Sequence, residues 1–319
     1  MNFSSILNDI YLQVQPLLGQ GKTASYIPAL RDVHPEQFSM AVTLNNGDFF
    51  GVGDYQKGFS IQSISKVFAF TLALRLFETE IYQRVWREPS GDPFNSLVLL
   101  EHEKGIPRNP FINAGAIVVC DSLISYISKK YHSIADTGAE PKLTTFNTML
   151  QFIQNSAADN SIGFDQQIFE SEMKHGFGNL ALANLMKSFG NIENDVNAVL
   201  QTYFQQCSVV MNVKQLSRSM LYLANKGMDP ITGQIIISKK HTKRINSLML
   251  TCGHYDASGD FAFNVGLPGK SGVGGGIAAI VPNKLAVAVY SPTLNKNGNS
   301  LIGTKALELF SEYTGYSIF

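Results

Sequence analysis

The chain has 319 residues, of which 45% are hydrophobic and 16% are charged, so it holds enough apolar material for a large buried core. Lys+Arg and Asp+Glu number 25 each, which excludes the basic excess typical of a nucleic-acid-binding protein. No cation precedes Lys22 and no apolar run approaches the ~20 residues that span a bilayer. We therefore expect a cytoplasmic protein with neither a nucleic acid nor a membrane as partner.

Cysteine and histidine are too scattered to predict a disulfide framework or a metal site. The three cysteines, Cys120, Cys207 and Cys252, form no C-x-x-C pair, and we expect them to be small buried hydrophobes. The six histidines show no metal-ligand spacing, so we expect neither a metal nor a cofactor. His254 lies in the loop-like stretch "CGHYDASGDF", and we expect it at the surface rather than in a pocket.

Both ends of the chain have strand patterns next to a terminal helix. Residues 3–18 are amphipathic and predict a helix, and "SMAVTLNNGDFFGVGD" predicts two strands joined around Asn45–Gly47. "GGIAAIVPNKLAVAVYSP" predicts a second hairpin that turns at Pro282–Asn283, and residues 300–314 predict a closing helix. Between them the pattern is nearly all helical, with candidate helices at 114–129, 144–156, 179–189, 195–206, 212–226 and 238–250.

This order of elements predicts an α+β fold. Strands from both ends can form one antiparallel sheet flanked by the terminal helices, with the middle of the chain as a mostly helical domain. We expect residues 1–319 to be a single catalytic unit, with a sheet subdomain from about 1–65 and 260–319 and a helical subdomain from about 66–259. A functional cleft would lie between the two.

The stretch "GFSIQSISKVFAF" places Ser63 and Lys66 where an apolar helix is expected to begin. Serine at this point is either a helix cap or, with a lysine three residues later, the nucleophile of an acyl-transferring enzyme whose base is the lysine. The same spacing recurs at Ser171–Lys174, but there the glycines of "HGFG" disfavour a continuous helix. On spacing alone, capping remains the better interpretation of Ser63.

A second motif, "GLPGKSGVGGGIAAIV", lies near the other end of the chain. It lacks the four-residue gap of a P-loop, and a strand rather than a helix is expected to follow it, so we reject a nucleotide-binding loop. Lys-Ser-Gly at residues 270–272 resembles the K-T-G element of Ser-x-x-Lys acyl enzymes, where an edge strand lines the cleft. We expect Val273 to lie at the start of that edge strand.

Six ordered motifs resemble those of the serine-dependent glutaminase family, whose fold is similar to that of β-lactamases and penicillin-binding proteins (transpeptidases). The resemblance runs from about Tyr26 to about Phe310 and is carried by "FSIQSISKVF", "NPFINAGAI", Ser-Glu followed by Gly-Asn at 171–179, "TYFQQCS", "TCGHYDASGDFAF" and "GLPGKSGVGGGI". It implies hydrolysis of L-glutamine to L-glutamate and ammonia through an acyl-enzyme on serine. It also implies no cofactor and a homo-oligomer, either a dimer or a tetramer.

The resemblance carries over residue by residue. It implies Ser63 as nucleophile, Lys66 as general base and Tyr255 as a pocket residue that also relays protons. The other substrate-binding positions that it implies are Tyr26, Gln62, Asn113, Glu172, Asn179, Tyr203 and, through its backbone, Val273. One departure is Gly178, where the family usually has arginine before the asparagine matched by Asn179. To act as a base Lys66 must be neutral, a state that burial or a nearby cation such as Lys270 would favour.

Several site residues also have a purely structural interpretation. Asn113 is placed to cap a helix that starts at Ala114, Glu172 to be a solvated helix residue, and Tyr203 to be part of a helix core. Two other functions remain open: a β-lactamase-like acyl-serine hydrolase, and a non-catalytic domain that senses an amide or a β-lactam. The first is expected with a periplasmic signal and the second with a membrane tether, and the sequence shows neither.

Overall fold

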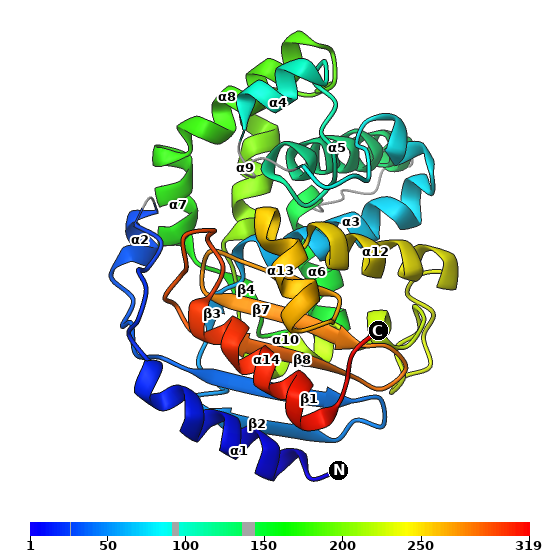
Figure 1. The fold of residues 1–319 in the computed structure, drawn as a ribbon. Coiled ribbons are helices and arrows are strands. Elements are labelled where there is room, and N and C mark those ends of the chain that lie inside the picture. Colours follow the sequence, from blue (N-terminus) through cyan, green and yellow to red (C-terminus); the bar gives the residue numbers. More distant parts are fainter. Residues whose placement is uncertain (26, 91–95, 136–143) are drawn as a thin grey trace.

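The fold is organised around one five-stranded antiparallel sheet (Figure 1). The computed structural model describes residues 1–25, 27–90, 96–135 and 144–319. The strand order is β2-β1-β8-β7-β6, with bounds β1 (Ser39–Leu44), β2 (Phe49–Gly53), β6 (Gly269–Ser271), β7 (Gly276–Val281) and β8 (Leu285–Tyr290). Val42 pairs with Val287, so β1 and β8 join the two ends of the chain as predicted. Both predicted hairpin turns are also confirmed.

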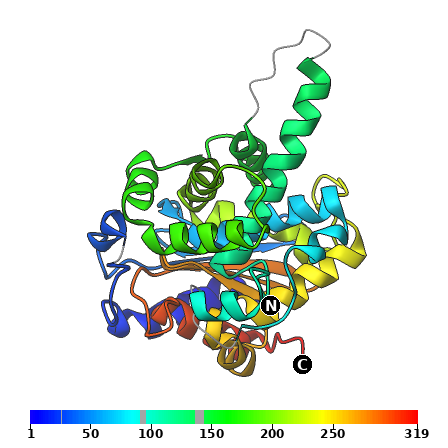
Figure 2. The same ribbon diagram turned by 90° about the horizontal axis from the view of Figure 1, so that it is seen from above.

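The sheet is buried on both faces because its side chains alternate between two cores. Ile277 and Ala279 of β7 face one core, which they share with the terminal helices α1 (Phe3–Val14) and α14 (Leu301–Thr314). Ala278 and Ile280 face the other core, built by helices from the middle of the chain. Figure 2 shows these two groups of helices on opposite sides of the sheet. The result is a layered α+β fold, as expected from the sequence.

Helices fill the middle of the chain, and most coincide with the predicted ones. The exceptions are informative: the predicted helix 212–226 is interrupted at Met220, and the first helix ends at Val14 in a short 3-10 turn that contains Pro16. The helices are α2 (Pro28–Arg31), α3 (Ser65–Phe77), α4 (Leu97–His102), α5 (Asn113–Ala135), α6 (Thr145–Ala157), α7 (Gln166–His175), α8 (Phe177–Ser188), α9 (Val196–Cys207), α10 (Val213–Ser219), α11 (Leu221–Ala224), α12 (Lys239–Cys252) and α13 (Ser258–Asn264).

A small second sheet, which the sequence did not predict, holds the segment before α3. Its strands are β3 (Phe59–Ser60), β5 (Val209–Met211) and β4 (Gly163–Phe164), in the order β3-β5-β4. The backbone N–H of Ile61 adds a further bond to the carbonyl oxygen of Val209, at 2.9 Å. The chain then makes one 3-10 turn, Gln62–Ile64, and continues directly into α3. This sheet fixes the position of Ser63 just before a buried helix.

Glycines let the turn after the edge strand β6 approach the Ser63 segment closely. A β-carbon on Gly272 would lie 2.4 Å from the carbonyl oxygen of Ile61, and one on Gly274 would lie 2.2 Å from that of Ser60. Such contacts are too short for any other residue, so these glycines serve close backbone packing. Val273 lies between them, in the turn that follows β6. The expectation that Val273 starts a strand is therefore wrong: the edge strand already ends at Ser271.

We expect Gly272→Ala to lower the free energy of unfolding by about 1–3 kcal/mol and to reduce turnover, because the added methyl must push the turn away from Ile61. Gly163→Ala is the matched control, since open space surrounds the missing β-carbon of Gly163 and its φ is ordinary. For Gly163→Ala, the free energy of unfolding should stay the same or rise by up to about 1 kcal/mol. Chemical denaturation and product release measure both effects. Equal stability of the two variants would contradict the close approach.

Candidate active site

Ser63 and Lys66 lie at the junction between the 3-10 turn and helix α3, and both are buried. Ser63 is 6% exposed and Lys66 is 1% exposed. The capping interpretation of Ser63 is wrong, because the N-cap of α3 is Ile64, which makes no side-chain cap bond. The second Ser-x-x-Lys match differs, since Lys174 on α7 is exposed to solvent. Of the two matches, Ser63–Lys66 is the one placed in a protected environment.

The amine of Lys66 is held by two oxygen atoms near the start of helix α5. Its Nζ donates to the carbonyl oxygen of Phe111 at 3.1 Å and to Oδ1 of Asn113 at 2.7 Å. Burial lowers the pKa of Lys66 to about 8, against the opposing charge effects of Cys207 and Glu172. A substantial fraction of this lysine is therefore neutral slightly above neutral pH.

Asn113 connects Lys66 to helix α8. While Oδ1 of Asn113 accepts from Lys66, its Nδ2 donates to Oδ1 of Asn179 at 2.9 Å. The capping interpretation of Asn113 is wrong, because Asn113 is itself the first residue of α5 and its Oδ1 accepts from Lys66. Asn109 closes the turn before the helix, where its Oδ1 accepts from the backbone N–H groups of Phe111 and Ile112. Lys66, Asn113 and Asn179 thus form one continuous polar chain. Open space surrounds the missing β-carbon of Gly178, the residue before Asn179. The absence of the arginine that the family usually has at this position therefore creates no buried cavity.

Glu172 is a buried carboxyl group beside the Ser63 segment. It is 7% exposed on helix α7, so its interpretation as a solvated helix residue is wrong. Burial raises the pKa of Glu172 to about 7, although a hydrogen bond with Gln62 and the charge of Lys66 oppose this rise. Gln62 has a positive φ of 45° and donates from Nε2 to Oγ of Ser60 at 3.1 Å. The strained backbone of Gln62 therefore places its side chain between the small sheet and Glu172.

Tyr255 lies between Ser63 and a second buried lysine. Ser63 acts to lower the pKa of its phenol against the larger effect of burial, and Nζ of Lys270 lies 4.3 Å from its ring centroid. Lys270 Nζ also donates to the carbonyl oxygens of Gly253 at 2.9 Å and Ser271 at 2.7 Å. Burial raises the pKa of the Tyr255 phenol. Its φ of 58° is unusual for a side chain of this size and marks a strained position.

Lys270, the second buried lysine, is electrostatically coupled to Lys66. Burial lowers the pKa of Lys270 well below its ordinary value, and the charge of Lys66 lowers it further. At Lys66, burial is likewise the largest cause of the lowered pKa.

Tyr203 and His254 are both buried. Tyr203 is 3% exposed on helix α9, in the core below Lys66, whose Nζ lies 5.8 Å from its ring centroid. His254 was expected at the surface, and this is wrong: it is 1% exposed and stacks on Phe261 with ring centroids 3.5 Å apart. The neutral imidazole ring is flat and aromatic, so it can stack on Phe261 as another aromatic ring would. Burial lowers its pKa well below the usual range.

Val273 borders an open cavity of about 700 Å³. The cavity is lined by residues 21–25, Asp256, Val273, 294–298 and Leu301. The side chain of Val273 packs with Ala24, Ile27 and Ile168, so it also has a structural role. The predicted pocket residue Tyr26 lies outside the described residues.

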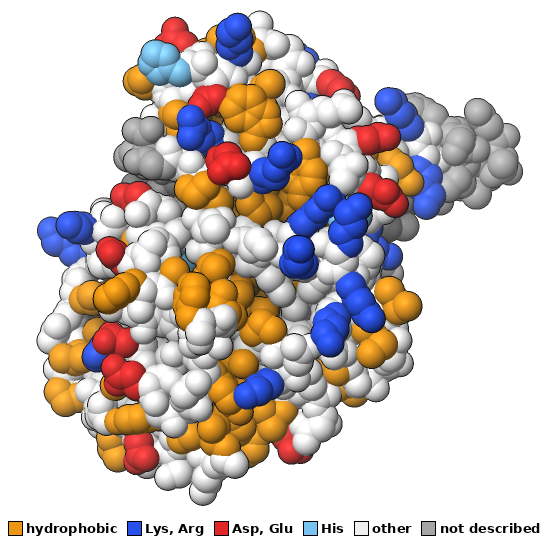
Figure 3. Space-filling model, turned by 45° about the vertical axis from the view of Figure 1, so that its right-hand side comes forward, with side chains coloured by type: hydrophobic (Ala, Val, Ile, Leu, Met, Phe, Trp, Pro, Cys, Tyr) orange, Lys and Arg blue, Asp and Glu red, His pale blue; other side chains and the backbone are white. Residues whose placement is uncertain are grey.

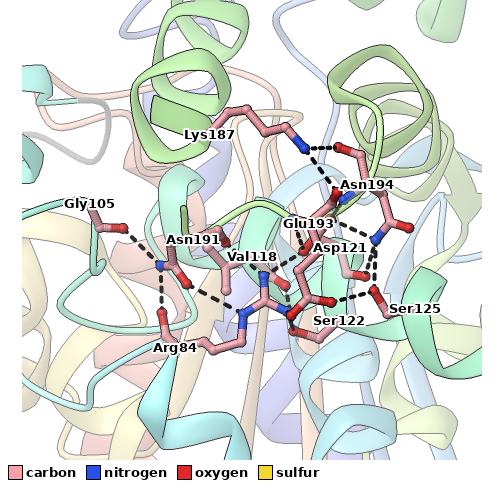
Figure 4. A network of polar contacts seen from close by, with 10 residues as sticks. All are labelled: Arg84, Gly105, Val118, Asp121, Ser122, Ser125, Lys187, Asn191, Glu193 and Asn194. Atoms are coloured by element: carbon pink, nitrogen blue, oxygen red, sulfur yellow. Dashed lines mark hydrogen bonds and ion pairs between the residues drawn. The ribbon is translucent and has the colours of Figure 1, made fainter. Parts of the chain in front are cut away.

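A polar network, shown in Figure 4, ties together the helices that carry the site. Asp121 on α5 is fully buried and pairs with Arg84, which follows α3. The same carboxylate accepts from the backbone N–H groups of Glu193 at 3.0 Å and Asn194 at 2.9 Å, in the loop between α8 and α9. Burial acts to raise the pKa of Asp121, but the bonds from Arg84 and this loop lower it overall. The network holds α5, α8 and α9 in a fixed relation.

Sequence reasoning missed two features of this site. It missed the acceptor role of Phe111, because a backbone carbonyl carries no residue-type signal, and it missed the Arg84–Asp121 network, whose members are far apart in sequence. No group of three or more His, Cys, Asp or Glu side chains suited to a metal was found among the residues that the structure describes. The described helices likewise include none that is both long and apolar enough to cross a bilayer.

The antiparallel sheet, the terminal helices on one face and the helical layer on the other define an α+β protein of the β-lactamase-like fold. A family model described as Glutaminase matches residues 21–319. A glutaminase of Aliarcobacter butzleri (strain RM4018) is 60% identical over 319 residues, covering all of both chains. One of Agrobacterium fabrum is 50% identical over 100% of this chain and 99% of its own.

Solved structures agree with the sequence comparisons. The Bacillus subtilis probable glutaminase has a TM-score of 0.87 and 30% sequence identity, over 100% of this chain and 98% of that one. A Bacillus glutaminase crystallised in 4.3 M NaCl also has a TM-score of 0.87 at 30% identity, over 100% of each chain. This chain therefore belongs to the glutaminase family.

We expect Asp121→Asn to lower the free energy of unfolding by about 3 kcal/mol, because Arg84 loses its buried carboxylate partner and keeps only the longer, 3.5 Å pair with the exposed Glu193. Asp32→Asn is the control, since the Arg31–Asp32 pair is solvent-exposed and surface pairs contribute about 0–1 kcal/mol. Urea denaturation of both variants at neutral pH provides the comparison. Similar small losses in the two variants would show that the network does not hold the helices.

Proposed function

We propose that this chain hydrolyses L-glutamine to L-glutamate and ammonia through an acyl-enzyme on Ser63, with Lys66 as general base. The observation that carries the proposal is the hydrogen bonding of the buried Lys66 amine. A neutral amine has two hydrogens and one lone pair. The oxygen atoms of Phe111 and Asn113 take two donated bonds, so the lone pair is left to accept the proton of a hydroxyl.

In the first half-reaction, Ser63 Oγ forms a bond with the carbon of the side-chain amide, and its proton passes to Lys66. The negative charge that develops on the amide oxygen needs fixed donors. The backbone N–H groups of Ser63 and Val273 are proposed for this role, and the close packing of the β6–β7 turn on residues 60–62 supports it. When the carbon–nitrogen bond breaks, ammonia leaves with a proton returned by Lys66 or relayed by Tyr255, whose buried phenol is influenced by Ser63.

In the second half-reaction, water attacks the ester carbon and gives its proton to Lys66. The carbon–oxygen bond to Ser63 then breaks, Ser63 recovers its proton and L-glutamate is released. No metal or cofactor is needed to balance either step. Each proton that Lys66 accepts is returned within the same half-reaction.

The amino-acid end of the substrate requires recognition of two opposite charges. We assign the α-ammonium to Glu172, the carboxyl group among the proposed site residues, and its burial supports the assignment because a buried carboxylate gains most from a cationic partner. The α-carboxylate is assigned to donors from Asn113, Asn179 and Tyr203. Gln62, which hydrogen-bonds with Glu172, is proposed to orient it. Tyr26 is proposed as a further substrate-binding residue on the resemblance alone.

We expect Ser63→Ala to lower turnover by about 10,000-fold or more while binding of L-glutamine persists, because the nucleophile is lost and the pocket remains. Ser171→Ala is the matched control from the other Ser-x-x-Lys match, and its turnover should stay close to that of the parent chain. Ammonia release and calorimetry measure the two quantities. A comparable loss of turnover in both variants would argue against Ser63 as nucleophile.

We expect kcat/KM to rise from pH 7 to about pH 9. Lys66, with a pKa of about 8, must be unprotonated to accept the serine proton, and Glu172, with a pKa of about 7, must be ionised to pair with the substrate. Both requirements are met only above the respective pKa, so the sign is an increase with pH. Initial rates at low substrate concentration in buffers of constant ionic strength give the profile. A flat or falling profile would contradict the role of Lys66.

We expect Glu172→Gln to lower kcat/KM for L-glutamine roughly 100-fold, since the α-ammonium loses its charged partner. The same variant should act almost normally on glutaric acid monoamide, which has the same side-chain amide but no α-amino group. Comparing the two substrates separates recognition from folding. If both substrates lose activity equally, Glu172 supports the structure and does not bind the ammonium.

A further inference from the structure

A second cavity, of about 610 Å³, lies between the segment that follows α3 and helix α12. It shares no lining residue with the proposed active site. Its walls are formed by Thr79, Tyr82, Arg87, Arg244, Ser247, Leu248 and Thr251. The wall therefore combines two guanidinium groups with an aromatic ring and an aliphatic side chain, and the glutaminase reaction as proposed uses none of these residues.

The two guanidinium groups approach the same ring. The Cζ atoms of Arg87 and Arg244 lie 5.7 and 5.8 Å from the ring centroid of Tyr82. In the described part of the chain, neither arginine is joined to a carboxylate, and Nη1 of Arg244 is buried without a hydrogen-bond partner. A buried charged donor without an acceptor is costly, and neither guanidinium has a carboxylate to offset its charge. An anion in the cavity would remove both costs.

The surroundings of the cavity also favour an anion. Lys239, Lys240 and Lys243 are exposed on the first half of α12, and Figure 3 shows Lys and Arg side chains gathered on the side of the molecule where this helix lies. Cations at a helix N-terminus oppose the helix dipole, so helix stability does not explain them. One negative group, the carboxylate of Glu78, also lies near this helix. It raises the pKa of His241, but burial lowers that pKa more strongly. A local positive field of this kind attracts anions in a chain of zero net charge.

We propose that this cavity is a binding site for a small organic phosphate monoester. The phosphate lies between Arg87 and Arg244, whose planar groups each present paired donors to its oxygens. Two positive groups match the double negative charge of a phosphate monoester better than the single charge of a carboxylate. The ring of Tyr82 and the side chain of Leu248 contact the organic part, for which the volume of the cavity leaves room.

Calorimetry of the full chain with phenyl phosphate tests the site, at constant ionic strength and with saturating L-glutamate present to occupy the active site. We expect saturable binding that Arg244→Gln weakens roughly 10- to 100-fold, because a charged hydrogen-bonding group is lost. Arg87→Gln, a change at an exposed position that does not threaten folding, should weaken it in the same sense. Lys243→Gln is the matched control: it removes one charge from the same helix outside the cavity and should have a much smaller effect.

Inorganic phosphate and benzoate separate the parts of the ligand, and both should bind more weakly than phenyl phosphate. If inorganic phosphate binds as tightly as phenyl phosphate, the proposal that the ligand has an organic part is wrong. If benzoate binds as tightly as phenyl phosphate, the proposal that the site selects a phosphate group is wrong. Equal weakening by Lys243→Gln and Arg244→Gln would mean a diffuse positive field and no site. Absence of saturable binding, or displacement of phenyl phosphate by L-glutamate, would also overturn the proposal. The parent chain and the variants should keep their glutaminase activity throughout.

Discussion

The amine of Lys66 is enclosed between helices α3 and α5, where its bonds to Phe111 and Asn113 are its polar contacts. Burying a charged amine is costly, so this position favours the neutral form that a general base requires. The structure around Lys66 keeps its amine buried. Every residue of α3 from Ser65 to Leu74 is buried, so this helix passes through the interior and its lysine cannot reach solvent.

The enclosure depends on parts of the chain that are distant in sequence. The small sheet holds the segment before α3, and the β6–β7 turn packs on it through glycines. The Arg84–Asp121 network fixes α5 against the loop between α8 and α9, and these three helices carry Asn113, Asn179 and Tyr203. On the other side of Ser63, Lys270 and Tyr255 form a second buried cation–aromatic contact. The residues proposed for catalysis are thus held in place by contacts that also pack the core.

The sequence allowed much of this to be predicted, but unevenly. The hairpins could be predicted because turn residues separate apolar runs too short for helices, such as the six residues of β8. Single residues were harder: Asn113 was equally suited to a cap, and Glu172 to a solvated face, until tertiary contacts decided. His254 was misjudged because "CGHYDASGDF" is polar as a segment, although Phe261 and Gly269 enclose its ring. Contacts made by main-chain atoms, such as that of Phe111, leave no trace in residue type.

The central claim is that Ser63 carries the acyl group during turnover. Rapid acid quench of the enzyme with L-glutamine, followed by mass spectrometry of the intact chain and of its peptides, tests it directly. We predict a transient adduct of one glutamyl group, located on Ser63 and absent from Ser63→Ala. An adduct on another residue would contradict the account. A second contradicting result would be full activity of Ser63→Ala together with steady turnover in which no covalent species is detected at quench times shorter than one catalytic cycle.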